Sequence, residues 1–240
     1  MRVSALALLL PLAACGVWSG DDDVPGVPGT GSGNERRYAV ADFSSIEQRG
    51  PDDVDVRVGT GFSVRAEGDD DVLSRVKIAK DGSRLLITRE GSGINWNSGS
   101  AKIYVTMPRI EAARLAGSGD IAIDRIEGGA FDGSIAGSGA LKLGRVGVDR
   151  LELSIAGSGS AEANGEADAL AVNIAGSGDV EAAGLRATSA DVNIAGAGNV
   201  RAVVNGPAKV AIMGAGDVDL GPQAKCDISK VGTGDVRCGG

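Results

Sequence analysis

The stretch IAGSGD at residues 174–179 recurs almost letter for letter as LAGSGD at residues 115–120. Its Gly-x-Gly core begins at Gly117, Gly137, Gly157, Gly176, Gly196, Gly214 and Gly232. The intervals between successive copies are 20, 20, 19, 20, 18 and 18 residues. A fixed period of this length is typical of a solenoid, in which each repeat forms one coil that stacks on the next.

Around each Gly-x-Gly, apolar and polar residues alternate. Equivalent positions of successive repeats form columns, and the first column after the glycines is apolar: Ile121, Leu141, Ala161, Val180, Val200, Val218 and Val236. Two positions later, the residues are again apolar, and a mostly charged column lies between. This is the period of a strand with one buried face. A unit of 18–20 residues fits three short strands, so the sequence predicts an all-β, three-sided parallel β-helix.

The glycines themselves are expected to form the corners of the coils. A glycine adopts positive φ without a Cβ penalty, and its missing side chain leaves room where successive coils crowd. The predicted corner residues are Gly117, Gly119, Gly137, Gly139, Gly157, Gly159, Gly176, Gly178, Gly196, Gly198, Gly214, Gly216, Gly232 and Gly234. They lack the third glycine and the helix of a dinucleotide-binding loop, which excludes a phosphate cradle.

The N-terminus indicates export. Residues 1–14 carry a short apolar run that is too short to span a bilayer and is typical of a signal peptide. The segment Leu12-Ala-Ala-Cys15 resembles the lipobox of bacterial lipoproteins, which implies that Cys15 is acylated and holds the mature chain to a membrane. Gly16 at the next position, by the same resemblance, favours the outer membrane.

Composition divides the rest of the chain into three parts. Residues 15–34 are rich in Gly, Pro, Ser and Asp and are expected to form a disordered tether. Residues 35–115 contain alternating apolar runs with turns between them, which predicts a β-rich section that caps or begins the solenoid. Residues 116–240 contain the Gly-x-Gly coils.

Charge and residue usage exclude several classes of function. The formal net charge is −8, which opposes binding to nucleic acid. The chain has no histidine, so it cannot use Ser-His-Asp or Cys-His catalysis or a His-ligated metal. No cofactor is expected.

Two cysteines remain after Cys15. Cys226 and Cys238 both occupy apolar columns of the last coil, and exported proteins form disulfides readily. The sequence therefore predicts a disulfide that crosses the last coil and closes its end.

Three segments together resemble a known family: RYAVADFSSIEQRGPDDVDVRVGTG, KIYVTMPRIEAARLAGSGD and the repeated IAGSGD. They are similar to the head GIN domain family of putative auto-transporter adhesins, over roughly residues 36–240. The resemblance implies a right-handed parallel β-helix and a role at the bacterial cell envelope.

Two groups of acidic residues could bind something. Asp120, Asp179, Asp217 and Asp235 directly follow Gly-x-Gly and, when stacked, could form a calcium ladder. Hydrogen bonds from corner amides to these carboxylates are the simpler expectation, because hard cations need six or more oxygen ligands. Asp132 and Glu152 are neighbours in one outward column and could act as a glycosidase pair, although the coils offer no aromatic platform for a sugar.

Trp96 lies in the loop sequence GSGINWNSGS, where it could contact a partner or pack on the end of the solenoid. From these features we expect a non-enzymatic envelope lipoprotein whose β-helix presents a rigid acidic surface for adhesion or envelope assembly. Its partners would be the membrane, through the lipid, and a cell-envelope or surface glycan or protein. The alternatives are a carbohydrate-active β-helix enzyme and a self-assembling scaffold.

Overall fold

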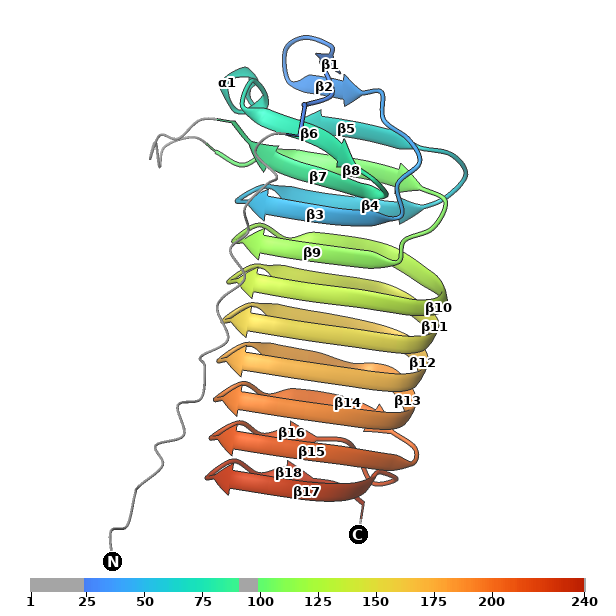
Figure 1. Ribbon diagram of the computed structural model, residues 1–240, viewed down its shortest axis with the longest axis vertical. Helices are drawn as coiled ribbons and strands as arrows, with labels where there is room; N and C mark the ends of the chain where they lie inside the picture. The colour runs from blue at the N-terminus through green and yellow to red at the C-terminus, as the bar shows by residue number, and fades with distance from the viewer. Residues whose placement is uncertain (1–23, 91–98, 240) are drawn as a thin grey trace, which may run out of the picture.

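The computed structural model describes residues 24–90 and 99–239. Within them the chain forms an 18-stranded sheet that winds into a right-handed solenoid (Figure 1). The strands of the N-terminal section are β1 (Gly29–Thr30), β2 (Glu35–Tyr38), β3 (Ser45–Gly50), β4 (Asp53–Val58), β5 (Ser63–Glu67), β6 (Val76–Asp81), β7 (Arg84–Arg89), β8 (Lys102–Met107) and β9 (Ala112–Gly117). The coils contain β10 (Ile121–Gly137), β11 (Ala140–Gly157), β12 (Ser160–Gly176), β13 (Asp179–Gly196), β14 (Val200–Val204), β15 (Pro207–Gly214), β16 (Val218–Asp219), β17 (Lys225–Gly232) and β18 (Val236–Arg237). A helix of one turn, α1 (Asp70–Leu73), lies at the N-terminal end.

The coils stack in parallel and in the register that the glycine repeat predicts. Gly117 pairs with Gly137, Gly137 with Gly157, and the same correspondence continues through Gly176, Gly196, Gly214 and Gly232. Each coil therefore places its columns directly below those of the previous coil, and the predicted all-β solenoid is confirmed.

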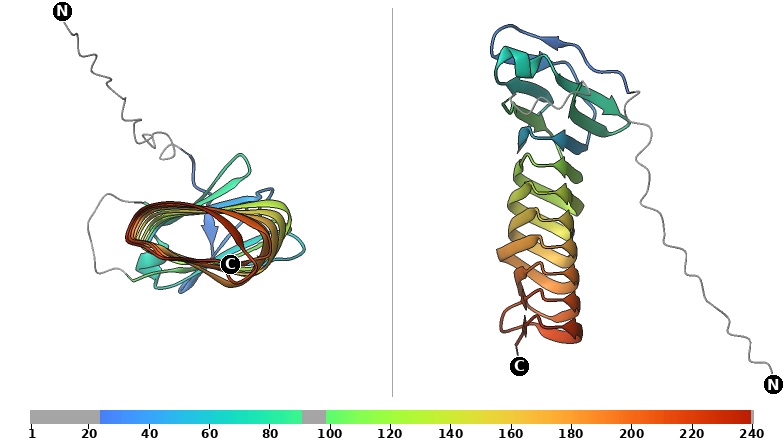
Figure 2. Two further views of the ribbon diagram at one scale, coloured as in Figure 1. Left: turned by 90° about the horizontal axis from the view of Figure 1, so that it is seen from below. Right: turned by 90° about the vertical axis from the view of Figure 1, so that its left-hand side faces the viewer.

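Three sides can be recognised from where the in–out alternation breaks. In β11 the buried residues are Leu141 and Leu143 on one side, Val146 and Val148 on the next, and Leu151, Leu153 and Ile155 on the third. The breaks fall at residues 144–145, 149–150 and 156–158, and the last of these is the Gly-x-Gly corner. Seen from the C-terminal end, the cross-section is a flattened loop (Figure 2).

The last coils are simpler. In the 18-residue units, only residues 205–206 lie between β14 and β15. The pairing of β13 with β14 changes register between Ala182 and Arg186 of β13. Val204 still pairs with Ala187 of the middle side, so this side is shortened in the 18-residue coils.

The N-terminal section both begins and caps the solenoid. Strands β3 and β4 form a first coil whose partners on one side are β9 and β10. On the other side they pair with β7 and β8, which come later in the sequence. The antiparallel strands β2, β5 and β6 then extend the sheet beyond β7 and β8.

Residues 24–34 differ from the predicted tether. Gly26 bridges to Ala79, the amide of Val27 donates to the carbonyl of Ile78 at 2.7 Å, and β1 pairs with β2. Val27 also packs against the core. These backbone contacts occupy the outer edge of β6, and an edge strand of a sheet would otherwise expose unpaired amides and carbonyls.

Candidate functional site

The predicted signal peptide, the predicted lipidation site Cys15 and the candidate contact residue Trp96 all lie outside the described residues. Among the residues that are described, no helix is long and apolar enough to cross a membrane. The candidate functional features that can be placed are the corners, the outward columns and the C-terminal end.

The corners are packed backbone against backbone. Gly137 has a φ of 139°, and a Cβ at this residue would overlap the carbonyl oxygen of Gly117 in the coil above. The amide of Ser138 donates to that same oxygen at 3.0 Å. The second glycine of the pair, Gly139, meets the carbonyl of Gly119 in the same way. The glycines thus act as stacking points.

The aspartates that follow the corners form a ladder of hydrogen bonds. The carboxylate of Asp179 accepts the amide of Asn199 at 3.0 Å, the side chain of Asn199 accepts the amide of Asp217 at 3.1 Å, and Asp217 accepts the amide of Asp235 at 2.8 Å. Near the N-terminal end, Asp120 accepts the amide of Ala140 at 2.9 Å. In each case the acceptor lies one coil before the donor. The column therefore fixes the register of successive coils at this corner.

No group of three or more Asp, Glu, Cys or His side chains suitable for a metal occurs in the described part of the chain. In the ladder, the carboxylates of Asp120, Asp179 and Asp217 each accept a hydrogen bond from a backbone amide.

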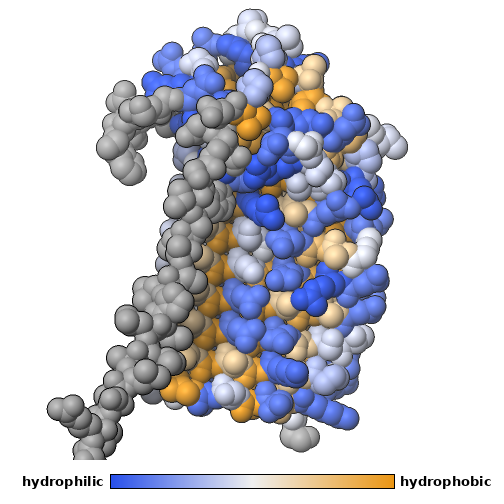
Figure 3. All heavy atoms as spheres, in the orientation of Figure 1, coloured by the Kyte–Doolittle hydropathy of each residue, from blue (hydrophilic) through white to orange (hydrophobic). Residues whose placement is uncertain are grey.

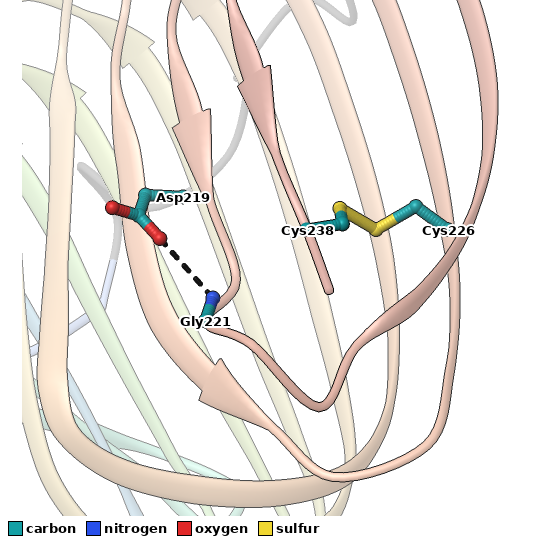
Figure 4. The surroundings of a disulfide bond; sticks show 4 residues. All are labelled: Asp219, Gly221, Cys226 and Cys238. Atoms are coloured by element: carbon teal, nitrogen blue, oxygen red, sulfur yellow. Dashed lines mark hydrogen bonds between the residues drawn. A yellow bond between two sulfur atoms is a disulfide. The ribbon is translucent and has the colours of Figure 1, made fainter. Parts of the chain in front are cut away.

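The strands after the corners present a charged surface, which we call the charge face. Its outward residues are Lys142, Glu162, Glu181, Arg201, Asp219 and Arg237. Arg201 contacts Glu181 of the previous coil at 2.7 Å, and Lys142 contacts Asp120 at 3.0 Å. The hydrogen bond that Lys142 donates to Asp120 raises the pKa of Lys142. Asp219 instead accepts the amide of Gly221 at 3.1 Å (Figure 4).

Next to the corners, the strands that precede them present an uncharged strip, which we call the groove face. A charged outward column with Asp132, Glu152, Asp191 and Lys209 lies two residues before it on the same strands. The polar column of the groove face contains Ser134, Ser154, Asn173 and Asn193, and the column beside it contains Ala136, Ala156, Ala175, Ala195 and Met213. Between them runs a groove of about 480 Å³ that crosses the coils from Arg114 to Met213. Asn193 donates to Asn173 at 3.2 Å, so the amides also form a ladder. Figure 3 shows apolar surface between hydrophilic side chains along these coils.

The two candidate catalytic carboxylates are neighbours, as their column requires. Asp132 of β10 pairs with Glu152 of β11, and both line a shallow depression of about 460 Å³ together with Arg109 and Arg150. Glu152 forms an ion pair with Arg150 at 3.3 Å. Phe131, the aromatic residue of this coil, is buried in the core and offers no platform for a sugar.

A disulfide joins Cys226 and Cys238, whose Cα atoms are 6.2 Å apart. It connects β17 to the residue that follows β18, and so crosses the interior of the last coil (Figure 4).

Two features were not predicted from the sequence: the buried Asp52 and the exposed Lys230. Asp52 is fully buried and accepts hydrogen bonds from Arg89 and from the amide of Ala101 at 2.7 Å. The hydrogen bond between Arg89 and Asp52 raises the pKa of the Arg89 guanidinium. Lys230 occupies a column that is otherwise isoleucine, where Ile212 is its partner. The break in that column was a visible signal; Asp52 gave none, because its partners lie far away in the sequence.

Comparison with known proteins agrees with this geometry. The family model described as "putative auto-transporter adhesin, head GIN domain" matches residues 42–224. A search of curated proteins found no significant match.

Several solved structures have the same fold. A putative adhesin from Bacteroides fragilis superposes with a TM-score of 0.79 at 21% identity, over 87% of this chain and 98% of that one. A putative lipid binding protein from Parabacteroides distasonis gives 0.67 at 21% identity, over 88% and 98% of the two chains. A putative adhesin from the same organism gives 0.66 at 22% identity, over 88% and 99%. The sequence features, the stacked coils and the family match together show that this chain belongs to the head GIN domain family of putative auto-transporter adhesins.

Proposed function

We propose that this protein is a non-enzymatic envelope lipoprotein, anchored in the outer membrane through acylated Cys15, whose solenoid presents a rigid acidic surface for adhesion or envelope assembly. Membership of an adhesin-like family supports an exported or surface location. The anchor rests on the sequence of residues 1–16.

The observation that carries the proposal is the regularity of the two outward faces. Successive coils lie about 4.8 Å apart, so each face repeats the same chemical group at that spacing along the rod. A cleft with converging groups suits a small substrate, whereas a long repeating face suits a long repeating partner. We therefore expect an extended partner, such as an envelope or surface glycan or a stretch of protein.

The groove face is the better candidate for the contact surface. It combines amide and hydroxyl groups with an apolar column, and such a mixture forms hydrogen bonds to hydroxyl-rich or peptide partners without the desolvation cost of ionised side chains. The charge face, by contrast, carries three basic and three acidic side chains, and ion pairs between coils, such as Arg201 with Glu181, already compensate part of that charge.

The test is a binding screen of the full chain, purified in detergent, against isolated peptidoglycan, lipopolysaccharide, capsular glycan, host-surface glycoproteins and phospholipid vesicles. Ala175→Arg places a long charged side chain in the groove, and Ala183→Arg makes the same change at an exposed residue of the neighbouring bend. We expect Ala175→Arg to weaken binding of a glycan or protein at least tenfold and Ala183→Arg to leave it within a factor of about two.

Three outcomes would contradict the proposal. Equal loss in both variants would move the contact away from the groove face. Binding of vesicles that Ala175→Arg weakens and Ala183→Arg does not, without binding of any glycan or protein, would favour a lipid-binding role for the groove. Turnover of a glycan that disappears in Asp132→Asn would identify an enzyme.

A further inference from the structure

The apolar column of the groove face is hollow at one end and protrudes at the other. Within the described residues, Met213 is 68% exposed and Val231 is 70% exposed. Both continue a column that is alanine in every strand from β9 to β13: Ala116, Ala136, Ala156, Ala175 and Ala195. Large apolar side chains that stand out from a surface are typical of a contact with a partner.

The repeat of the groove face restricts what can follow it along the rod. Its groups recur about every 4.8 Å, whereas an extended peptide presents a side chain to one face only about every 6.7 Å and would lose register. A glycan would meet alanine, methionine and valine in place of an aromatic platform. A second copy of this solenoid has the same spacing, and its own groups therefore stay in register over the whole face.

The distribution of large and small residues selects one arrangement of two copies. With a twofold axis along the rod, each residue would meet its own coil, so that Met213 would lie against Met213 and the alanines would face each other across a gap. With the axis parallel to the strands, the rods are antiparallel, the order of the coils is reversed, and every column lies against its own copy. Only the second arrangement places protruding residues opposite hollow ones.

We propose that the groove face packs against the groove face of a second, antiparallel copy of this chain, with the twofold axis at Ala175. The proposal rests on the proposed function and names its partner. In this register Met213 lies opposite Ala136, and Val231 lies opposite Ala116. The overlap from β9 to β17 is about 29 Å long and about 20 Å wide. It covers about 600 Å² on each copy, less than the roughly 800 Å² of a standard interface, so the pair should be weak and reversible.

The charged column beside the groove face supports the same register. Asp132 lies opposite Lys209 of the second copy, and symmetry repeats this attraction at the other end of the interface. In the described part of the chain neither residue has an ion pair of its own. Glu152 lies opposite Asp191, which opposes the contact, but Arg150 already compensates Glu152 at 3.3 Å.

An antiparallel pair would join two membranes. The two N-terminal sections lie at opposite ends of the pair, and with them the two proposed lipid anchors at Cys15. Copies in facing membranes can therefore overlap along their groove faces, whereas copies in one membrane stand parallel. The adhesion that follows is homophilic.

The first experiment measures the dimer dissociation constant of the full chain in detergent by sedimentation velocity over a concentration series. Asp132→Lys and Lys209→Asp each place like charges opposite each other, and each should raise the dissociation constant at least tenfold. An equimolar mixture of the two variants restores both attractions and should dimerise within about threefold of the wild type. Glu166→Lys, at an exposed carboxylate on another side of the coil, is the control and should stay within a factor of about two.

A size exchange tests the register without charge. Met213→Ala should weaken the dimer at least fivefold, and the added substitution Ala136→Met should restore it, because the protrusion and the hollow have changed places. A monomeric wild type at all concentrations, or failure of both the mixture and the size exchange to restore pairing, would overturn the proposal. Binding of another partner that Ala175→Arg weakens would then leave the proposed function standing.

Vesicles test the joining of membranes. Two vesicle populations should adhere only when both carry the chain, and Asp132→Lys vesicles should adhere to Lys209→Asp vesicles but not to one another. Adhesion with the chain on one population alone would contradict homophilic pairing. Loss of the chain from vesicles that still dimerises in solution would contradict the anchor and leave the paired groove faces intact.

Discussion

The first coil and the repeat coils belong to one stack, but different contacts hold them together. In the first coil, the fully buried Asp52 binds Arg89 and the amide of Ala101, and the buried Glu47 contacts Arg84 at 2.7 Å. These contacts join residues 37–49 positions apart. In the repeat coils, the polar contacts join each residue to its equivalent in the next coil and recur along the rod.

This difference in contacts determines how well each part of the molecule tolerates amino-acid substitution. A ladder distributes stability over many similar contacts, so that a single outward residue contributes little and is free to vary with the partner. A buried ion pair concentrates stability in one place, because removal of one partner leaves the other charge buried without compensation. We therefore expect the faces of the coils to tolerate substitution and the first coil to resist it.

The largest loss of stability should come from a substitution at a Gly-x-Gly corner, where successive coils pack backbone against backbone. In Gly137→Ala, the new Cβ overlaps the carbonyl oxygen of Gly117 and the residue must keep a φ of 139°. We expect a loss of about 5 kcal/mol or more in the free energy of unfolding, in the range reserved for severe packing defects. Urea denaturation followed by circular dichroism measures it.

Gly128→Ala is the matched control. Gly128 also has a φ of 139°, but a Cβ there would have no neighbour within 4 Å. Its cost should be backbone strain alone, about 1–3 kcal/mol. Similar losses in both variants would show that positive φ, and not the stacking of coils, accounts for the glycine repeat.

The next effect should come from the first coil. Asp52→Ala leaves the Arg89 guanidinium without its carboxylate, and we expect a loss of about 3–5 kcal/mol. Glu181→Ala removes the exposed ion pair with Arg201 and should cost less than about 1 kcal/mol. Thermal melting of both variants checks the comparison, and a smaller loss for Asp52→Ala than for Glu181→Ala would reverse it.

This contrast also explains what could be predicted from the sequence. The columns through Ile121 and Gly117 repeat at a fixed interval, so the coils, their register and the place of the disulfide follow from spacing. Asp52 occurs once and binds residues that are adjacent only after folding, so no local pattern indicates its role. The pairing of Gly26 and Val27 with β6 was missed because it uses backbone groups, which a Gly- and Pro-rich composition does not reveal.

The candidate surfaces could be predicted only in part. The outward columns that form the charge face and the groove face are visible once the repeat is aligned. The groove between Asn173 and Ala175 depends on the relative depth of neighbouring columns, which spacing does not specify. The lysine at position 230 breaks an isoleucine column, but its hydrogen bond to Gly234 depends on a turn that closes only in the folded end.

A single step of the aspartate ladder should contribute modestly. Asp217→Ala removes the acceptor of the Asp235 amide, and we expect a loss of about 1 kcal/mol, the usual net value of one hydrogen bond. Exchange of the Asp235 amide should accelerate while that of Ile174 stays the same. Asp168→Ala, at an exposed carboxylate on another side of the coil, is the control and should change neither quantity.

The smallest effect should be electrostatic and should depend on pH. Lys142 is 47% exposed and donates to Asp120 at 3.0 Å. This contact raises the pKa of Lys142 above its ordinary value. Its stabilisation is therefore complete below the unfolded-state pKa of about 10.4 and is lost as the pH rises through the folded-state pKa. Because the pair is exposed, we expect it to contribute less than about 1 kcal/mol.

Lys142→Gln isolates this contribution. The difference in the free energy of unfolding between the wild type and this variant should stay constant from about pH 7 to about pH 10 and then shrink, because only the ammonium form gains from Asp120. It should also shrink when salt is added at pH 8. A difference that persists at high pH would assign the contribution of Lys142 to the packing of its aliphatic stem along the coil. The charge face would then stabilise the solenoid through the packing of its aliphatic stems, and its charged groups would be available to bind a partner.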